Sequence, residues 1–117
     1  MEERRKFERL SVFADIIFKK KEPPQKDTAS LTKNISKGGI CFIAYEKLNP
    51  GELIDMTIFL PYEVPIRATG RVAWVNEFIV GNTEHKRYDV GIEFIEISDQ
   101  DRELIGKHVF TKLHPDK

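Results

Sequence analysis

The sequence predicts an all-β domain that ends in one helix. Short segments rich in Val, Ile, Phe and Thr recur roughly every ten residues, and turn-forming residues separate them. In the final segment the apolar residues change to helical spacing. Strands at this spacing favour a barrel or a sandwich over a fold in which strands alternate with helices. Closing the sheet into a barrel would also remove its exposed edges.

The first half of the chain carries three predicted strands. Leu10–Phe18 alternates apolar residues on one face with a mixed set on the other. Leu31–Ile35 and Ile40–Tyr45 are shorter, and a bend at Gly38-Gly39 separates them. Between the first two strands, Lys19–Asp27 contains two consecutive prolines, and we expect it to be an exposed loop.

Three more strands are predicted in the second half. Leu53–Leu60 ends at a proline, Pro65–Phe78 is the longest β segment, and Tyr88–Ile97 alternates again. Gly70 lies inside the longest segment and suggests a bend or a bulge there. Alternate positions of that segment are predicted to line one face: Ile66, Ala68, Gly70, Val72 and Trp74. Trp74 could serve as a ligand platform, but its inward-alternating position favours the core.

The last segment has the start and stop signals of a helix. Ser98 is a candidate N-terminal cap, and acidic residues follow it in the first turn. Leu104, Ile105 and Val109 then recur at helical spacing, and Pro115 comes shortly after the apolar stripe. This stripe needs a barrel flank or a partner chain to pack against.

Composition narrows the class of protein. The chain has 117 residues, the size of one domain, and its 19 basic residues are balanced by 19 acidic ones. A neutral chain lacks the basic surface typical of proteins that bind nucleic-acid polymers. The sequence shows no signal peptide and no apolar run long enough for a membrane helix, so we expect a cytoplasmic protein without membrane insertion.

No pattern of residues predicts catalysis, a cofactor or a metal site. Cys41 is the single cysteine and is expected to be a small buried side chain in an apolar strand. His85, His108 and His114 do not have the spacing of metal ligands, and we expect them on the surface. Phosphate-binding glycine loops are absent from the sequence. These observations favour a binding protein over an enzyme.

Two polar segments indicate a ligand. Residues 4–9 combine Arg4, Arg5 and Arg9 with a phenylalanine, and guanidinium groups fork onto phosphate or guanine edges and stack on planar rings. Residues 34–39 place Asn34 and Ser36 on one side of a strand end, next to glycines that permit close backbone approach. Taken singly, the first segment is better explained as a solubilising terminus and the second as an ordinary turn.

In this order and spacing, the two segments resemble the paired signature of the PilZ domain family, RxxxR followed by [D/N]xSxxG. The first half is Arg5–Arg9 and the second is Asn34–Gly39. Gly70–Trp74 resembles the family's GxVxW strand, and Val90–Phe94 resembles its VGIxF strand. Together with the C-terminal helix, the resemblance extends over about residues 3–113.

The resemblance implies a six-stranded antiparallel PilZ-type β-barrel and a bacterial receptor for cyclic di-GMP. In the family, the RxxxR arginines clamp guanine and phosphate, which gives this role to Arg5 and Arg9. The [D/N]xS side chains contact the other guanine, which implies the same contact for Asn34 and Ser36. The final glycine of the motif, Gly39, keeps the backbone close to the ligand.

Two features of the motif bear on affinity and stoichiometry. Asn34 stands where the family more often has aspartate, and an amide lacks the charge that binds guanine N–H groups most strongly. In the family, an arginine immediately before RxxxR accompanies two stacked ligand molecules. Arg4 therefore implies two cyclic di-GMP molecules per chain.

The expected function is that of a receptor or adaptor built from a single PilZ domain. The arm of residues 1–9 is expected to be mobile without ligand and to close over it on the barrel of residues 10–97, with the helix at residues 98–114. The closed state would then pass the signal on by binding a downstream partner protein or by forming a homo-oligomer. The processes controlled would be motility, exopolysaccharide production or biofilm formation. Lys19–Lys21 is either part of a partner face or a solvated loop.

Two other classes of binding protein stay open. A PilZ-like module that does not bind nucleotide would act through protein contacts alone, although the intact RxxxR and NxSxxG motifs argue against it. A small barrel that binds RNA or single-stranded DNA would combine a basic groove with exposed aromatic residues, which the neutral charge disfavours.

Overall fold

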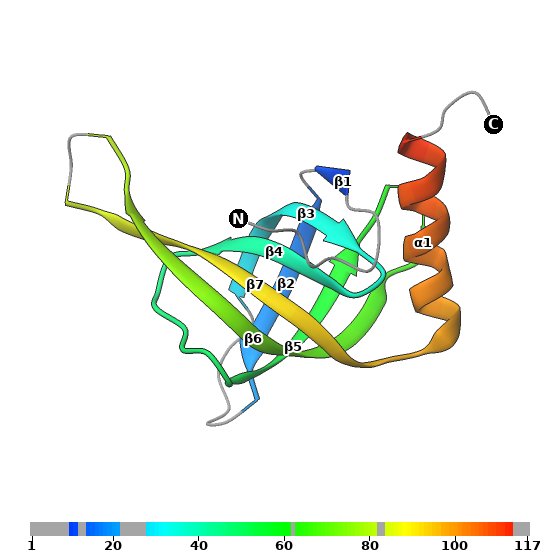
Figure 1. Ribbon diagram of the computed structural model, residues 1–117, viewed down its shortest axis with the longest axis horizontal. Coiled ribbons are helices and arrows are strands. Elements are labelled where there is room, and N and C mark those ends of the chain that lie inside the picture. Colours follow the sequence, from blue (N-terminus) through cyan, green and yellow to red (C-terminus); the bar gives the residue numbers. More distant parts are fainter. Residues whose placement is uncertain (1–9, 12–13, 22–27, 62, 82–83, 114–117) are drawn as a thin grey trace.

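The computed structural model describes residues 10–11, 14–21, 28–61, 63–81 and 84–113. Within this part of the chain, seven strands precede one helix (Figure 1). The strands are β1 (Leu10–Ser11), β2 (Asp15–Lys20), β3 (Thr28–Ser36), β4 (Gly39–Ala44), β5 (Leu53–Phe59), β6 (Ile66–Ile79) and β7 (Lys86–Ile97). The helix α1 is Asp99–Leu113.

Six of the strands close into an antiparallel barrel. The ring runs β2–β5–β6–β7–β4–β3 and returns from β3 to β2, and every pairing in it is antiparallel. The short strand β1 adds to the end of β3. The predicted six-stranded barrel with one C-terminal helix is therefore confirmed.

The barrel encloses the core because strand alternation sends apolar side chains inward. On β5, for example, Ile54, Met56 and Ile58 are buried while the residues between them are partly exposed. The rings of Phe18 and Phe42 pack with their centroids 4.5 Å apart. Full burial of each such side chain contributes about 1.5–3 kcal/mol to the free energy of unfolding.

The predicted first strand is in fact two strands. β1 pairs only with the end of β3, whereas β2 pairs with the beginning of β3 and with β5. Ala14 lies outside both strands, and its backbone N–H donates to the Thr32 side-chain hydroxyl at 3.1 Å. The Thr32 backbone N–H still donates to the Ala14 carbonyl at 2.9 Å, so a side-chain hydroxyl replaces only one of the two backbone bonds here, which apolar alternation alone does not reveal.

The segment predicted as an exposed loop begins later than expected. β2 continues through Lys20, which pairs with Ile54 of β5. Lys20 also forms an ion pair with Glu52 at 3.4 Å, and Lys21 forms one with Asp55 at 3.3 Å. Lys19 and Lys20 are therefore strand residues, and the acidic partners on β5 and just before it explain why lysines are accommodated there.

Trp74 is not a core residue, contrary to the prediction from alternation. A bulge shifts the β6–β7 register between Val72, which pairs with Ile92, and Trp74, which pairs with Gly91. One extra residue moves the next inward position to Val75, which packs against the core. Trp74 is consequently turned to the outer face and is 44% exposed.

The helix begins as predicted but buries one residue that was expected on the surface. The Ser98 hydroxyl accepts a hydrogen bond from the Asp101 backbone N–H at 3.0 Å, which is an N-terminal cap. Ile105 and Val109 are buried as expected. His108 shares their face of the helix and is only 8% exposed, so its predicted surface location is wrong.

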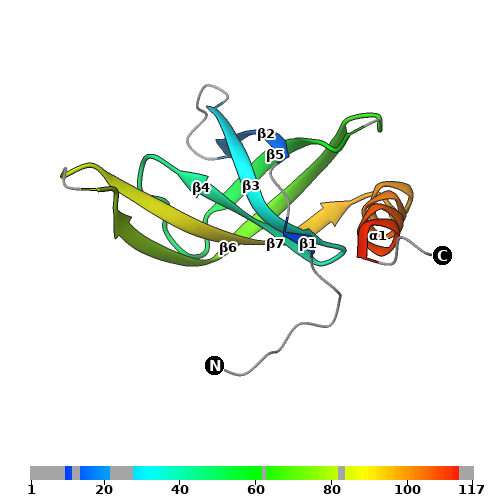
Figure 2. The same cartoon turned by 90° about the horizontal axis from the view of Figure 1, so that it is seen from above.

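The helix and the end of the longest hairpin lie at opposite ends of the molecule. Figures 1 and 2 show α1 beside one end of the barrel, while the β6–β7 hairpin projects from the other end. Of the helices in the described part of the chain, none is long and apolar enough to cross a membrane.

Candidate functional site

The end of β3 presents Asn34 and Ser36 on the outer face of the barrel. Ile35 between them is fully buried, so the two polar residues point away from the core. Asn34 is half-buried, and Ser36 is buried with its hydroxyl accepting a hydrogen bond from the Gly38 N–H at 3.2 Å. A hydroxyl that accepts this bond can still donate another to a ligand.

The turn after Ser36 is held by the helix and by β7. The Arg102 guanidinium donates to the backbone carbonyl of Lys37 at 2.6 Å, and the Lys37 ammonium pairs with Glu103 at 3.1 Å. The Gly38 carbonyl accepts from the Phe94 N–H at 3.0 Å. The backbone of the turn that follows Asn34 and Ser36 is therefore held in place by contacts with both α1 and β7.

Gly39 has a structural role of its own. A Cβ atom at this position would lie 2.2 Å from the backbone carbonyl oxygen of Ile92 on β7. Only glycine therefore fits where β4 begins and pairs with β7. The requirement for glycine thus comes from the neighbouring strand β7 of the barrel, independently of any ligand.

The start of the described chain lies next to the same motif. Leu10 pairs with Ile35 and Ser11 pairs with Asn34. The segment that carries RxxxR thus joins the barrel at Leu10, beside the two polar residues of β3. Arg4, Arg5 and Arg9 themselves lie outside the described residues, so the structure brings Asn34, Ser36 and Gly39 together and leaves the arginine positions as predictions.

A row across the outer face of the sheet connects Asn34 to Trp74. Asn34 pairs with Cys41 on β4, Cys41 with Gly91 on β7, and Gly91 with Trp74 on β6. Paired residues point to the same face, so the amide and the indole lie on one surface, about 14 Å apart at a strand spacing of about 4.8 Å.

The residues between Asn34 and Trp74 are small, and the indole uses the space that they leave. Cys41 is buried, as predicted. At Gly91, a Cβ atom would meet the indole Nε1 of Trp74 at 2.2 Å, so the ring lies over the bare backbone of β7. The sequence favoured a core position for Trp74 over an exposed platform, and the apolar pattern gave no sign of the bulge that turns the indole outward.

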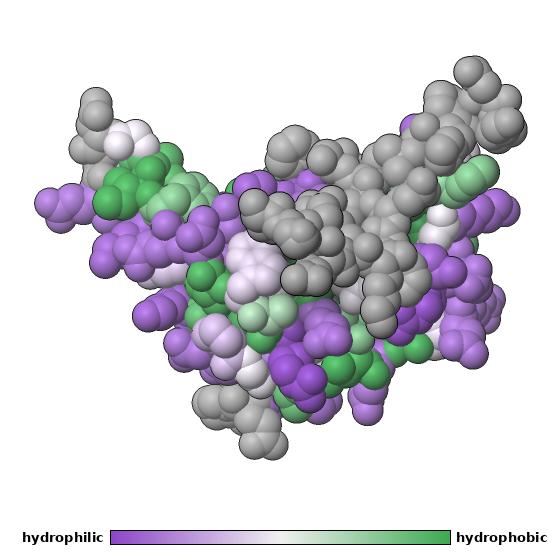
Figure 3. Space-filling model, viewed as in Figure 1, coloured by the Kyte–Doolittle hydropathy of each residue, from purple (hydrophilic) through white to green (hydrophobic). Residues whose placement is uncertain are grey.

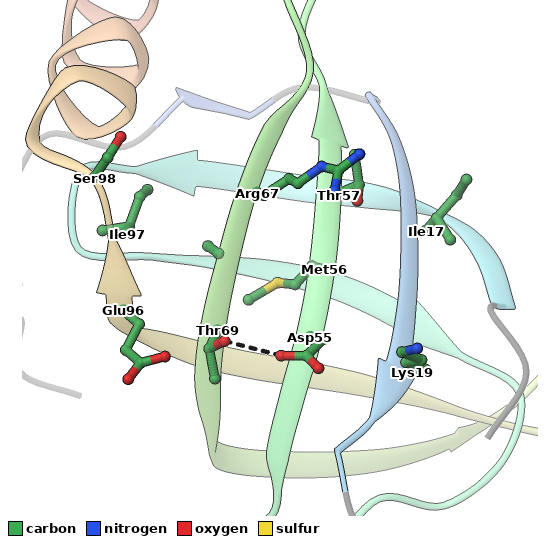
Figure 4. Close-up of a pocket in the computed structure, with 11 residues that line it drawn as sticks. Ile17, Lys19, Asp55, Met56, Thr57, Arg67, Thr69, Glu96, Ile97 and Ser98 are labelled. Carbon is green, nitrogen blue, oxygen red and sulfur yellow. Dashed lines mark hydrogen bonds between the residues drawn. The ribbon is translucent and has the colours of Figure 1, made fainter. Parts of the chain in front are cut away.

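A polar groove lies on another part of the barrel (Figure 4). It has a volume of about 600 Å³ and is lined from β2, β5, β6 and the end of β7. Burial raises the pKa of Asp55, but hydrogen bonds from Thr69 and Lys21 and the charges of Lys21 and Lys19 outweigh it and lower the pKa. Of the predicted site residues, the three that the structure describes, Asn34, Ser36 and Gly39, do not line this groove.

The described residues contain no cluster of His, Cys, Asp or Glu that could hold a metal ion. The PilZ domain family matches residues 3–111 of the chain. The chain belongs to the PilZ domain family. A PilZ domain is a binding module and is not known as an enzyme family.

Solved PilZ structures share the fold. The chain resembles the Bacillus subtilis inhibitor of motility MotI (DgrA) with a TM-score of 0.78 and 21% identity, covering 99% of this chain and 54% of that one. It resembles the PilZ domain of Escherichia coli YcgR, solved with c-di-GMP, with a TM-score of 0.74, 11% identity and 97% of both chains covered.

A third similar structure is the MrkH–c-di-GMP complex of K. pneumonia, with a TM-score of 0.77, 16% identity, and 98% of this chain and 55% of that one covered. The PilZ domain thus spans about half the length of MotI and of MrkH. A search of curated protein sequences found no match to the chain.

Proposed function

We propose that this PilZ domain is a receptor for cyclic di-GMP, which binds at the outer end of β3. The observation that carries the proposal is the pairing of Leu10 with Ile35 and of Ser11 with Asn34. Consecutive Cα atoms are about 3.8 Å apart, so Arg9, the residue before Leu10, belongs within reach of the NxS side chains. Structures of similar fold that were solved with c-di-GMP, among them those of YcgR and MrkH, support the choice of ligand.

The groups of the motif suit this ligand chemically. Arg5 and Arg9 supply guanidinium forks for phosphate and for the O6/N7 edge of guanine. The Asn34 amide has both acceptor and donor groups of the kind that pair with a guanine edge, and the Ser36 hydroxyl is a donor. Gly39 lets β4 lie close to β7, so no side chain at this position projects from the surface beneath the ligand.

Trp74 extends the site along the outer face. Its indole is 44% exposed and lies in the same row as Asn34, with only Cys41 and Gly91 between them. A planar ring of this kind offers a stacking surface to a purine or to a guanidinium group. We infer that it contacts the ligand, and that two stacked cyclic di-GMP molecules, held in part by Arg4, span the distance from Asn34 to Trp74.

The mechanism is an ordering of residues 1–9 by the ligand. Arginine contacts to the ligand exist only when the arm lies against the barrel, so ligand binding shifts the arm toward that state. Lys37 in the turn is joined to α1 by the hydrogen bond from Arg102 and by the ion pair with Glu103. A movement of the motif would therefore shift these contacts and change the position of α1. The resulting surface signals to a downstream partner protein in the cytoplasm, in control of motility, exopolysaccharide or biofilm formation.

The fluorescence of Trp74 provides the test, because it is the only tryptophan of the chain. Cyclic di-GMP should change the emission saturably, and the Arg5→Ala, Arg9→Ala double variant should lose the response. Arg67→Ala is the matched control, because Arg67 is an exposed arginine that lines the polar groove instead. An unchanged response in the double variant, or no response in the native chain together with no binding by calorimetry, would refute the proposal and leave a module that acts through protein contacts alone.

A further inference from the structure

The outer part of β6 has an open edge. β5 pairs with β6 only from Ile66 to Arg71, and the last bonds on that side join Val72 to Gly51 and Glu52. Ala73 is the bulged residue, and from Trp74 to Ile79, within the described residues, β6 pairs with β7 alone. Alternate backbone N–H and C=O groups of this stretch therefore point away from β7 toward the open side.

The same stretch belongs to a two-stranded ribbon that extends beyond the barrel. On the other side of the hairpin, β4 accompanies β7 only as far as the pair of Ala44 with Tyr88. Figure 1 shows the ribbon leaving the barrel, and Figure 3 shows apolar surface gathered near its end. Ile79 is 58% exposed and Val80 is 44% exposed. Isolated two-stranded hairpins have marginal stability in water, so a further strand would stabilise this one.

The two edges of the ribbon differ in charge. The edge of β7 begins with Lys86 and Arg87, and such charged residues are a common means of blocking strand addition. The open edge of β6 from Ala73 to Ile79 carries one charge, Glu77, which is already paired with Lys86 at 3.6 Å. The β6 edge is therefore the one that remains suited to accept another strand.

We propose that the β6 edge pairs with the β6 edge of a second copy of this chain. Antiparallel pairing about a two-fold axis is self-complementary, because each copy presents the same edge with the same groups. It would join two ribbons into one four-stranded antiparallel sheet and cover the exposed apolar residues near the hairpin end. The neutral net charge of the chain means that two copies do not repel each other at long range. This inference does not depend on nucleotide binding.

Sedimentation velocity tests the association. The mean mass should rise with concentration from 13.6 kDa toward twice that value. Ile79→Lys should weaken the association by about tenfold, because it removes buried apolar area and adds a charge to each copy. Val64→Lys is the control, because Val64 is an exposed apolar residue in a loop away from the hairpin. A mass of one chain at every concentration, or equal weakening by both variants, would overturn the proposal.

Cysteine cross-linking tests the geometry of the edge. Single cysteines placed in turn from Ala73 to Ile79 should form intermolecular disulfides at one or two neighbouring positions, where the two-fold axis lies. Only there do equivalent residues come within the roughly 4.4–6.8 Å between Cα atoms that a disulfide needs. The native Cys41 is buried, so the unmodified chain is the blank. Equal cross-linking along the whole edge, or none at any position, would contradict antiparallel pairing of two β6 strands.

Discussion

Replacing Gly39 with alanine should destabilise the barrel strongly. The new Cβ would lie 2.2 Å from the Ile92 carbonyl oxygen, whereas real Cβ atoms essentially never come closer than 3.0 Å to another atom. The obstacle is backbone of a central strand, so β4 and β7 must separate by at least 0.8 Å, the difference between 3.0 and 2.2 Å. A side-chain rotation cannot relieve this contact.

The cost follows from that separation. The adjacent hydrogen bond from the Phe94 N–H to the Gly38 carbonyl measures 3.0 Å, and a widening of this size takes it beyond normal length. Losing it costs about 1 kcal/mol, and forced overpacking of a core adds about 1–3 kcal/mol. We therefore expect the free energy of unfolding to fall by about 2–4 kcal/mol, a large part of the 5–15 kcal/mol of a typical domain.

Urea denaturation followed by circular dichroism measures this change. Gly106→Ala is the matched control, because there the Cβ would meet Lys37 Cδ at 2.7 Å, and that flexible side chain can move. Alanine also raises helix propensity by up to about 1 kcal/mol over glycine. If Gly39→Ala unfolds within about 0.5 kcal/mol of the native chain, the close approach of β4 to β7 is not what requires glycine at this position.

Three further changes test the fold and its packing. Phe42→Ala should lower the free energy of unfolding by about 3–5 kcal/mol in urea, because it empties the fully buried site against Phe18. Ser98→Ala removes the cap of α1 and should cost about 1 kcal/mol in the same assay. Burial, with a smaller effect of Lys112, lowers the pKa of His108 from 6.5 against an opposing effect of Glu63. As the pH falls, His108 is therefore protonated at a higher pH in the unfolded chain than in the folded one. The free energy of unfolding should accordingly decrease as the pH drops below about 6.5. His108→Gln should flatten that part of the stability profile, and an unchanged profile would rule out His108 as its origin.

The sequence predicted the elements whose signals are local. The Ser98 cap, the apolar stripe of α1 and the alternation on β5 each depend on residues close together in the chain, and all three appear in the structure. The barrel followed from strand number and from the PilZ resemblance. Asn34 and Ser36 share the outer face of β3 as expected, because Ile35 between them takes the inward position.

The features that the sequence did not predict depend on pairing between distant segments. The bulge after Val72 exists only relative to β7, and it reverses the direction of Trp74 without any change in the apolar pattern. Likewise, Lys20 joins β2 because Glu52 and Ile54 lie across from it on the β5 side. His108 shows the same limit, because a stripe of apolar residues does not reveal that a polar neighbour shares their buried face.

Calorimetric titration of cyclic di-GMP into the purified chain tests whether the chain is a receptor. We expect saturable binding near two ligands per chain, and its loss in the Arg5→Ala, Arg9→Ala variant, because charge-assisted anchors are removed. One ligand per chain with the same dependence on Arg5 and Arg9 would keep the receptor and contradict the role given to Arg4. Absence of binding at high ligand concentration, in a chain whose circular dichroism shows the folded barrel, would contradict the receptor itself.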